Sequence, residues 1–214
     1  MSWPMLSKLA ALVLSAGLDV ESPAPAAAWR LPLEPYPVDD TCLAWGGTNG
    51  NFPRCGRPGK HVADDACVPN GTTVLAVAAG RLRYAGLIDD CFTNWGWVIV
   101  VEHELPDGPH VCSVYGHCEP LAGIAAGQDI AFAQPIASVA NPCVPHIHFG
   151  IYNRPFDATE GTYPYWLVGY LPDARQCESF PAAFPGDWVD PVQFVQERVA
   201  LTGRPWSQVK RLYR

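Results

Sequence analysis

A succession of short β-rich segments constrains the fold of this chain more than any other feature. Residues 95–104 are strongly apolar and β-branched, which predicts a central strand. The turn residues Pro106-Asp107-Gly108-Pro109 follow, so residues 110–117 should return as the partner strand of a hairpin. Further short strands are expected at residues 72–77, 81–85, 130–132, 136–139 and 145–152. Many short strands separated by turns predict a mainly β, antiparallel architecture.

The segments on either side of these strands have a different character. Residues 29–58 are rich in Pro and Gly and are expected to form an N-terminal arm that wraps the core as loop; the sequence leaves open whether this arm is a removable inhibitory segment. Residues 153–189 have little periodicity and are expected to be an insert loop. Asp190, Pro191 and Gln193 have the spacing of a capped helix start, which opens a C-terminal helical closure at 190–214 with a second short helix expected at 205–213.

Composition and the first residues indicate the compartment. A basic residue, an apolar run at 9–18 and an Ala/Pro-rich stretch predict a signal peptide at 1–28, hence a secreted or periplasmic protein. The apolar run is too short to span a bilayer, and we expect no integral membrane segment. Eight cysteines without a Cys-x-x-Cys pair favour disulfides, and the alternative is buried free thiols in a cytosolic protein. The net charge of −7 argues against a nucleic-acid partner.

Five side chains in three separate motifs could form one metal site. His61 and Asp65 are four residues apart, His117 ends Tyr115-Gly116-His117, and His146 and His148 lie in Pro145-His146-Ile147-His148-Phe149. Residues two apart on a strand point to the same face, so His146 and His148 would face one spot. Two histidines and a carboxylate can hold zinc and leave a fourth position for water, with two more histidines beside it. This combination indicates a metal-dependent hydrolase.

Each motif alone has a plainer interpretation. His61 and Asp65 could be a surface ion pair, His117 a structural histidine, and His-x-His two solvent-facing residues of an edge strand. His103 and His110 lie near the hairpin turn, and we assign them no chemistry.

The order, spacing and flanks of the three motifs together resemble those of the lysostaphin-type (LytM-like) zinc metallopeptidases. The resemblance extends to the stretches 70–80, 97–103 and 126–130 and to Asp190-Pro191, around a metallopeptidase core at 59–152. It implies a compact antiparallel β-sheet/barrel-sandwich hybrid domain with a groove. It also implies one Zn²⁺ per chain, held by His61, Asp65 and His148, with His117 and His146 as the catalytic pair.

The resemblance further implies a substrate class. Members of this family cleave peptide bonds in bacterial peptidoglycan, in stem peptides or in cross-bridges, so peptidoglycan peptides are the expected partner of a monomeric enzyme. The chain departs from the family pattern in five places. Ala63 replaces a glycine, residues 51–60 contain no tyrosine that could bind the oxyanion, and Cys55 and Cys67 flank the first motif. Val144-Pro145 replaces small residues before His-x-His, and the segment 153–189 is longer than a typical family loop. The alternatives are a non-catalytic member of the same fold that binds the cell wall or activates another hydrolase, and a secreted structural protein with incidental histidines.

Overall fold

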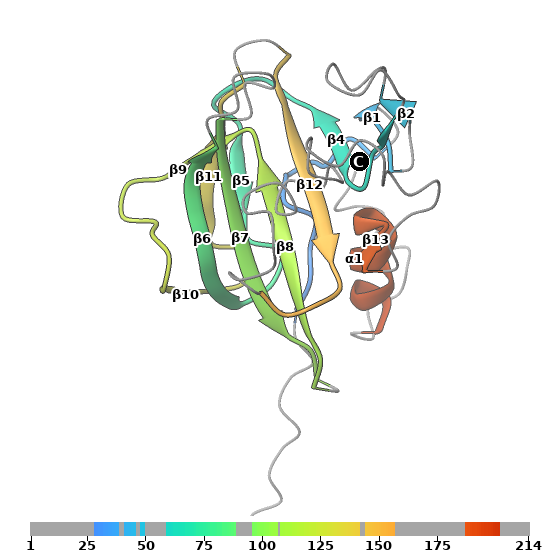
Figure 1. Cartoon of the computed structure of the whole chain (residues 1–214), viewed down its shortest axis with the longest axis vertical. Helices are drawn as coiled ribbons and strands as arrows, with labels where there is room; N and C mark the ends of the chain where they lie inside the picture. The colour runs from blue at the N-terminus through green and yellow to red at the C-terminus, as the bar shows by residue number, and fades with distance from the viewer. Residues whose placement is uncertain are drawn as a thin grey trace, which may run out of the picture.

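The computed structural model describes residues 28–38, 41–45, 48–49, 59–88, 96–106, 108–141, 144–156 and 187–201 of the 214-residue chain. Within these ranges the protein is built almost entirely of antiparallel β-strands with one helix (Figure 1). That helix is too short and too polar to cross a bilayer.

The main sheet has eight strands and contains the predicted hairpin at its centre. Seven of them run in the order β1-β4-β12-β8-β7-β6-β10, and β13 pairs with β12. Their bounds are β1 Thr41–Leu43, β4 Asp64–Cys67, β6 Gly80–Ile88, β7 Gly96–Glu104, β8 His110–Gly116, β10 Asp129–Ile130, β12 His146–Tyr152 and β13 Trp188–Val189. The sheet thereby brings β4 and β8, which are far apart in sequence, to the two sides of β12.

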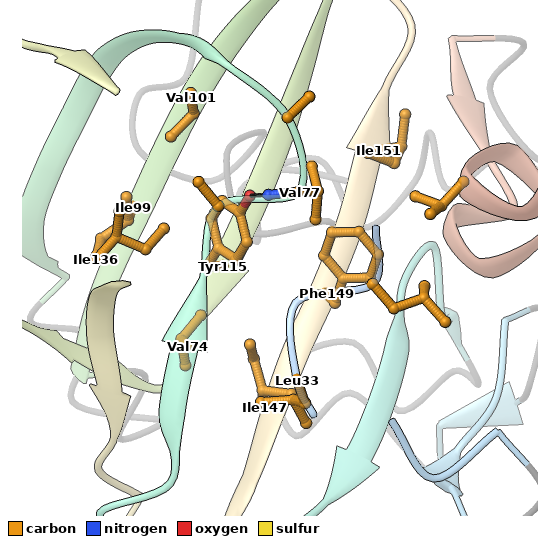
Figure 2. Close-up of a cluster of buried hydrophobic side chains, with 14 of the residues drawn as sticks. Leu33, Val74, Val77, Ile99, Val101, Tyr115, Ile136, Ile147, Phe149 and Ile151 are labelled. Atoms are coloured by element: carbon orange, nitrogen blue, oxygen red, sulfur yellow. Dashed lines mark hydrogen bonds between the residues drawn. The ribbon is translucent and has the colours of Figure 1, made fainter. Parts of the chain in front are cut away.

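A smaller sheet packs against the inner face of the main sheet and closes the core. Its strands are β5 (Thr73–Leu75), β11 (Pro135–Val139) and β9 (Cys118–Pro120), and two short strands, β2 (Thr48–Asn49) and β3 (Gly59–Lys60), form a separate ribbon. Figure 2 shows Val74 and Ile136 on one side of Tyr115 and Phe149 on the other. The Tyr115 hydroxyl accepts a hydrogen bond from the backbone N–H of Val77 at 3.1 Å, so the one polar atom of this buried ring is satisfied.

Side chains along β7 and β12 point alternately into the core and to the opposite face of the main sheet. Ile99 and Val101 lie in the core between the sheets, whereas Val98 and Val100 belong to a second apolar cluster on the outer face. On β12, Phe149 points into the core, and His148 therefore points to the outer face. His146 and His148 are thus presented on the face away from the main core.

The first described residues are built into the core. Alternate side chains from this segment are almost fully buried in the main cluster: Trp29, Leu31, Leu33 and Tyr36. Backbone hydrogen bonds join this segment to β5 and the residues that follow it. Arg30 N donates to Val77 O, and Leu75 N donates to Pro32 O. This part of the expected N-terminal arm is therefore buried against the core.

The helix α1 (Pro191–Leu201) packs beside β12 and starts as predicted (Figure 1). The Asp190 carboxylate accepts hydrogen bonds from the N–H groups of Val192 and Gln193, both at 3.0 Å, which is the expected N-cap geometry. The Gln193 side chain donates to Glu197 and does not reach back to the cap, so the reciprocal half of a capping box is missing.

The predicted class, mainly β with antiparallel sheets, is confirmed, and most predicted strands are present. The prediction at 130–132 was too long, because pairing there is limited to Asp129–Ile130. The helix expected at 205–213 and the greater part of the insert loop, 157–186, lie outside the described residues.

Candidate metal centre

Three donor atoms from two distant parts of the chain converge on one point. His61 Nε2 lies 3.1 Å from His148 Nδ1 and 3.2 Å from Asp65 Oδ1, and His148 Nδ1 lies 2.9 Å from Asp65 Oδ1. All three side chains are buried. Ligand atoms on a tetrahedral zinc ion at ~2.0–2.2 Å stand about 3.3 Å apart, so this triangle fits zinc with little movement.

The register of the main sheet brings these three side chains together. His148 on β12 is directly opposite Asp65 on β4 and, on its other side, opposite Gly116 on β8. His61 precedes β4 by a short segment and folds back over it. A Cβ added to Gly116 would lie 3.1 Å from His148 Cβ, so the glycine between Tyr115 and His117 leaves the room that the ligand needs.

Two of the three side chains, His148 and Asp65, are in the protonation state that suits a metal, and His61 can present a lone pair to the same point. His61 Nδ1 lies 3.3 Å from the backbone carbonyl of Ala44, to which it can donate, and Nε2 then presents its lone pair to the site. Burial lowers the pKa of His148 to about 4, so its imidazole is neutral at neutral pH. Burial alone would raise the pKa of Asp65, but contacts with His148 and His61 lower it below its ordinary value, and the carboxylate stays ionised.

The neighbouring aspartate has a different role. Asp64 points to the opposite face of β4, and its Oδ2 accepts a hydrogen bond of 2.6 Å from the Tyr36 hydroxyl. Burial raises the pKa of Asp64 to about 6. Asp64 therefore anchors the N-terminal arm, and Asp65 alone of this pair faces the metal triangle.

His117 and His146 lie side by side next to the triangle. Their ring centroids are 4.4 Å apart, and the His117 ring centroid is 6.2 Å from that of His148. His146 Nδ1 lies 2.6 Å from the Val144 carbonyl, and Nε2 lies 3.7 Å from Asp65 Oδ2. With the proton on Nδ1, the Nε2 lone pair faces the metal side.

The backbone of His117 is unusual. Its φ is +57°, a left-handed conformation that non-glycine residues rarely adopt and that concentrates at functional sites. The His117 carbonyl accepts a hydrogen bond from Ala140 N at 2.9 Å. Ala140 precedes Asn141, whose backbone N–H and C=O both bond to the Asn70 side chain at 2.9 Å, so the strand end around His117 is fixed from two sides.

All five residues singled out in the sequence thus lie together, and the two excluded histidines lie elsewhere. His103 is buried in the core between Ala79 O and Ser113 Oγ, and His110 pairs with Glu102 at the far end of the hairpin. Sequence reasoning missed the carbonyls of Ala44 and Val144, because a backbone acceptor leaves no trace in residue type. It also left open the strand conformation of β4.

The structure describes four of the eight cysteines. Cys67, after the first motif, forms a disulfide with Cys42. Cys112 and Cys118 are free and buried, so at most six of the eight cysteines can pair. The remaining four lie outside the described residues: Cys55, Cys91, Cys143 and Cys177. Ala63, in place of the family glycine, does not adopt a positive φ and is tolerated without strain.

Residues 59–159, which carry all five side chains, match the family model of peptidase family M23. This domain belongs to peptidase family M23. No curated protein matches the chain significantly. The M23 assignment confirms the resemblance drawn from the sequence motifs, and it places the metal triangle within the matched segment.

Three solved structures are similar to this chain, and the first of them supports the fold. CbpA from L. salivarius REN is 17% identical with a TM-score of 0.51, covering 81% of this chain and 98% of that one. The antimicrobial peptidase lysostaphin from Staphylococcus simulans is 18% identical with a TM-score of 0.45, covering 76% and 52%. A zinc containing peptidase from Vibrio cholerae is 24% identical with a TM-score of 0.42, covering 64% and 41%. The chain therefore spans about half or less of the length of the last two proteins.

Proposed function

We propose that this M23 domain is a secreted zinc-dependent metalloendopeptidase that hydrolyses peptide bonds in bacterial peptidoglycan, in stem peptides or cross-bridges. The observation that carries the proposal is the buried triangle of His61 Nε2, Asp65 Oδ1 and His148 Nδ1. Two imidazoles and one carboxylate form a donor set typical of catalytic zinc with an open fourth position. One zinc ion per chain follows from the single triangle among the described residues.

The remaining two histidines supply proton transfer in this proposal. A zinc ion bound by the triangle would polarise a substrate carbonyl and lower the pKa of a water molecule. His146, with Nδ1 committed to the Val144 carbonyl, has Nε2 available to accept a proton on the metal side. His117, ring to ring with His146, is placed to return a proton to the leaving amine or to stabilise the oxyanion when protonated.

Export from the cytoplasm is supported by two independent features. The apolar run at 9–18 has the length of a signal-peptide core. The Cys42–Cys67 disulfide is of a kind that persists in oxidising compartments. Both fit an enzyme whose substrate is the cell wall.

The alternative is a non-catalytic M23 domain that binds the wall or activates another hydrolase. Such a protein has no need for a complete set of ligands and proton-transfer groups. The presence of all five side chains in one cluster, four of them buried and His146 half-buried, favours the enzyme.

The test separates ligand from catalyst. Purified protein should contain one zinc ion by metal analysis and should solubilise purified peptidoglycan unless a chelator is present. His148→Ala should lose zinc and hydrolysis together. His146→Ala should keep zinc while hydrolysis falls by about 10²–10⁴, the usual contribution of general acid–base catalysis. His110→Ala, a histidine outside the site, is the matched control and should change neither.

Three outcomes would count against the proposal. Zinc-loaded protein that hydrolyses no wall peptide under any condition would support the non-catalytic alternative. Loss of zinc in His146→Ala with retention in His148→Ala would reverse the two roles. Protein that binds no zinc would remove the basis of the proposal.

A further inference from the structure

A backbone carbonyl from the N-terminal arm lies beside the nitrogen of His61 that faces away from the metal triangle. A neutral imidazole carries one proton, and the hydrogen bond made by one nitrogen fixes the role of the other. His61 Nδ1 lies 3.3 Å from Ala44 O, while Nε2 lies 3.1–3.2 Å from the other two ligand atoms. The His61 ring is fully buried, so this carbonyl takes the place that water would otherwise fill.

Ala44 is held beside His61 by a double attachment to the strand that carries Asp65. It directly follows β1, which pairs with β4 so that Leu43 is opposite Asp65 and Thr41 is opposite Ala66. The register shifts between Thr41 and Leu43, which leaves Cys42 as the extra residue of a bulge. Cys42 forms the disulfide with Cys67, so the bulged residue of β1 is the one that carries the covalent link.

The other end of the link is equally close to the site. Cys67 follows Asp65 by two residues and is directly opposite His146 on β12. The disulfide therefore joins Cys42, two positions before Ala44, to the strand pair β4 and β12. This pair carries the proposed metal ligand Asp65 and the proposed catalytic residue His146. A three-residue edge strand such as β1 has few ladder hydrogen bonds of its own, so the covalent link carries much of its attachment.

Upstream of β1 the arm is anchored independently in the core. Tyr36 is fully buried and donates its hydroxyl proton to Asp64, the residue next to Asp65. The Trp29, Leu31 and Leu33 side chains pack in the main hydrophobic cluster. Loss of the disulfide would therefore release the 41–45 segment while leaving 28–38 in place.

We propose that residues 28–38 and 41–45 are an integral part of the metal centre and that the Cys42–Cys67 disulfide holds the Ala44 carbonyl as a positioning group on His61. This inference rests on the proposed role of His61 as a zinc ligand. It gives these residues of the arm a role in building the site, so they do not act as a removable inhibitory segment. A partner of this kind behind a metal-bound histidine contributes about 10–100-fold to metal affinity.

The experiment measures zinc affinity directly, by competition with a chromophoric chelator, on the full chain. The double variant Cys42→Ser/Cys67→Ser should bind zinc about 10–100-fold more weakly than the wild type. Cys112→Ser, at a buried free thiol outside the site, is the matched control for the substitution and should leave the affinity unchanged. Val199→Ala removes core contacts of α1 and reports what lost stability alone does to zinc binding.

A spectroscopic measurement on the wild type provides a second test that needs no variant. In the zinc-loaded protein, nitrogen-detected histidine spectra should show the His61 proton on Nδ1 and protected from exchange with solvent. In the double variant the same proton should exchange rapidly. Circular dichroism confirms that each variant is folded before its affinity is compared.

The outcomes distinguish this inference from the proposed function. Wild-type protein without stoichiometric zinc would overturn both. Tight zinc in the wild type, together with unchanged affinity in the folded double variant, would overturn the positioning role alone. A His61 proton on Nε2 in the zinc-loaded wild type would also overturn it, even if the double variant failed to fold.

Discussion

The buried histidine outside the site, His103, should make the stability of this fold sensitive to mild acid. Its ring is 1% exposed, with Nδ1 2.9 Å from the Ala79 carbonyl and Nε2 2.7 Å from the Ser113 hydroxyl. If Nδ1 donates to Ala79, Nε2 accepts from Ser113, and both nitrogens are satisfied by the neutral ring. Burial lowers the pKa of His103 from 6.5 to about 4.

The sign and size of the effect follow from proton linkage. Between pH 6.5 and about 4 the unfolded chain binds a proton at His103 and the folded protein does not, so stability falls as pH falls through this window. The contribution of the neutral His103 to the free energy of unfolding is fully present above pH 6.5. Each pKa unit corresponds to about 1.4 kcal/mol, so the total loss attributable to His103 is about 3 kcal/mol.

Other buried groups titrate in the same range, so the measurement must be a difference. Asp64, whose pKa burial raises to about 6, acts in the opposite sense and favours the folded protein as pH falls. His103→Gln removes the titrating ring while an amide can still donate to Ala79. Urea unfolding of both zinc-free proteins at neutral pH and at roughly pH 4.5 isolates the His103 contribution, because the Asp64 contribution is common to both.

The expected result is that wild type loses more stability than His103→Gln on acidification, by about 1.4 kcal/mol for each pH unit below the unfolded pKa. At neutral pH the variant is expected to be the less stable protein, because a glutamine cannot reproduce both hydrogen bonds. Equal pH dependence in the two proteins would refute the reasoning, since it would mean that the folded His103 titrates normally.

Two further predictions concern the site and the helix. Gly116→Ala should weaken zinc binding in chelator competition, because its new Cβ would lie 3.1 Å from that of His148 and push the ligand out of register; unchanged affinity would show that β8 moves away freely. Asp190→Ala should lower the free energy of unfolding by about 1 kcal/mol in urea titrations, because two helix N–H groups lose their acceptor, and Asp190→Asn should retain most of it. Equal losses in both Asp190 variants would indicate a charge effect in place of a cap.

The strands that could be predicted from sequence are those whose own residues decide their structure. The stretch Val98–Val101 is apolar and β-branched on both faces, which matches its burial between two clusters, and its turn and partner strand follow directly. The strand β12 shows the same logic, with Ile147 and Phe149 in the core and two histidines between and beside them. The five site residues were found because three short motifs supplied them in a recognisable order.

The parts that escaped prediction depend on distant partners. Asp64-Asp65-Ala66-Cys67 has no strand signal of its own, since aspartates are rare in strands, and it becomes β4 through pairing with β12 and β1. The partner of Cys67 could not be chosen from spacing alone, because it lies on a strand whose position is fixed by that same pairing. His103 looked incidental beside a turn, and only the sheet registry reveals that it faces the core.

The adjacent pair Asp64-Asp65 has a consequence for how mutational scans of this protein will be interpreted. Because neighbouring residues on a strand face opposite ways, a slip of β4 by one position would exchange the carboxylate under Tyr36 with the one between the histidines. A scan that scores only lost activity would report the two aspartates alike. Substitution of Asp65 is expected to remove a metal ligand, whereas substitution of Asp64 is expected to destabilise the fold around the site. Separate measurements of metal content and of the free energy of unfolding would distinguish the two roles. The same holds wherever two adjacent acidic residues lie on a strand that carries a metal ligand.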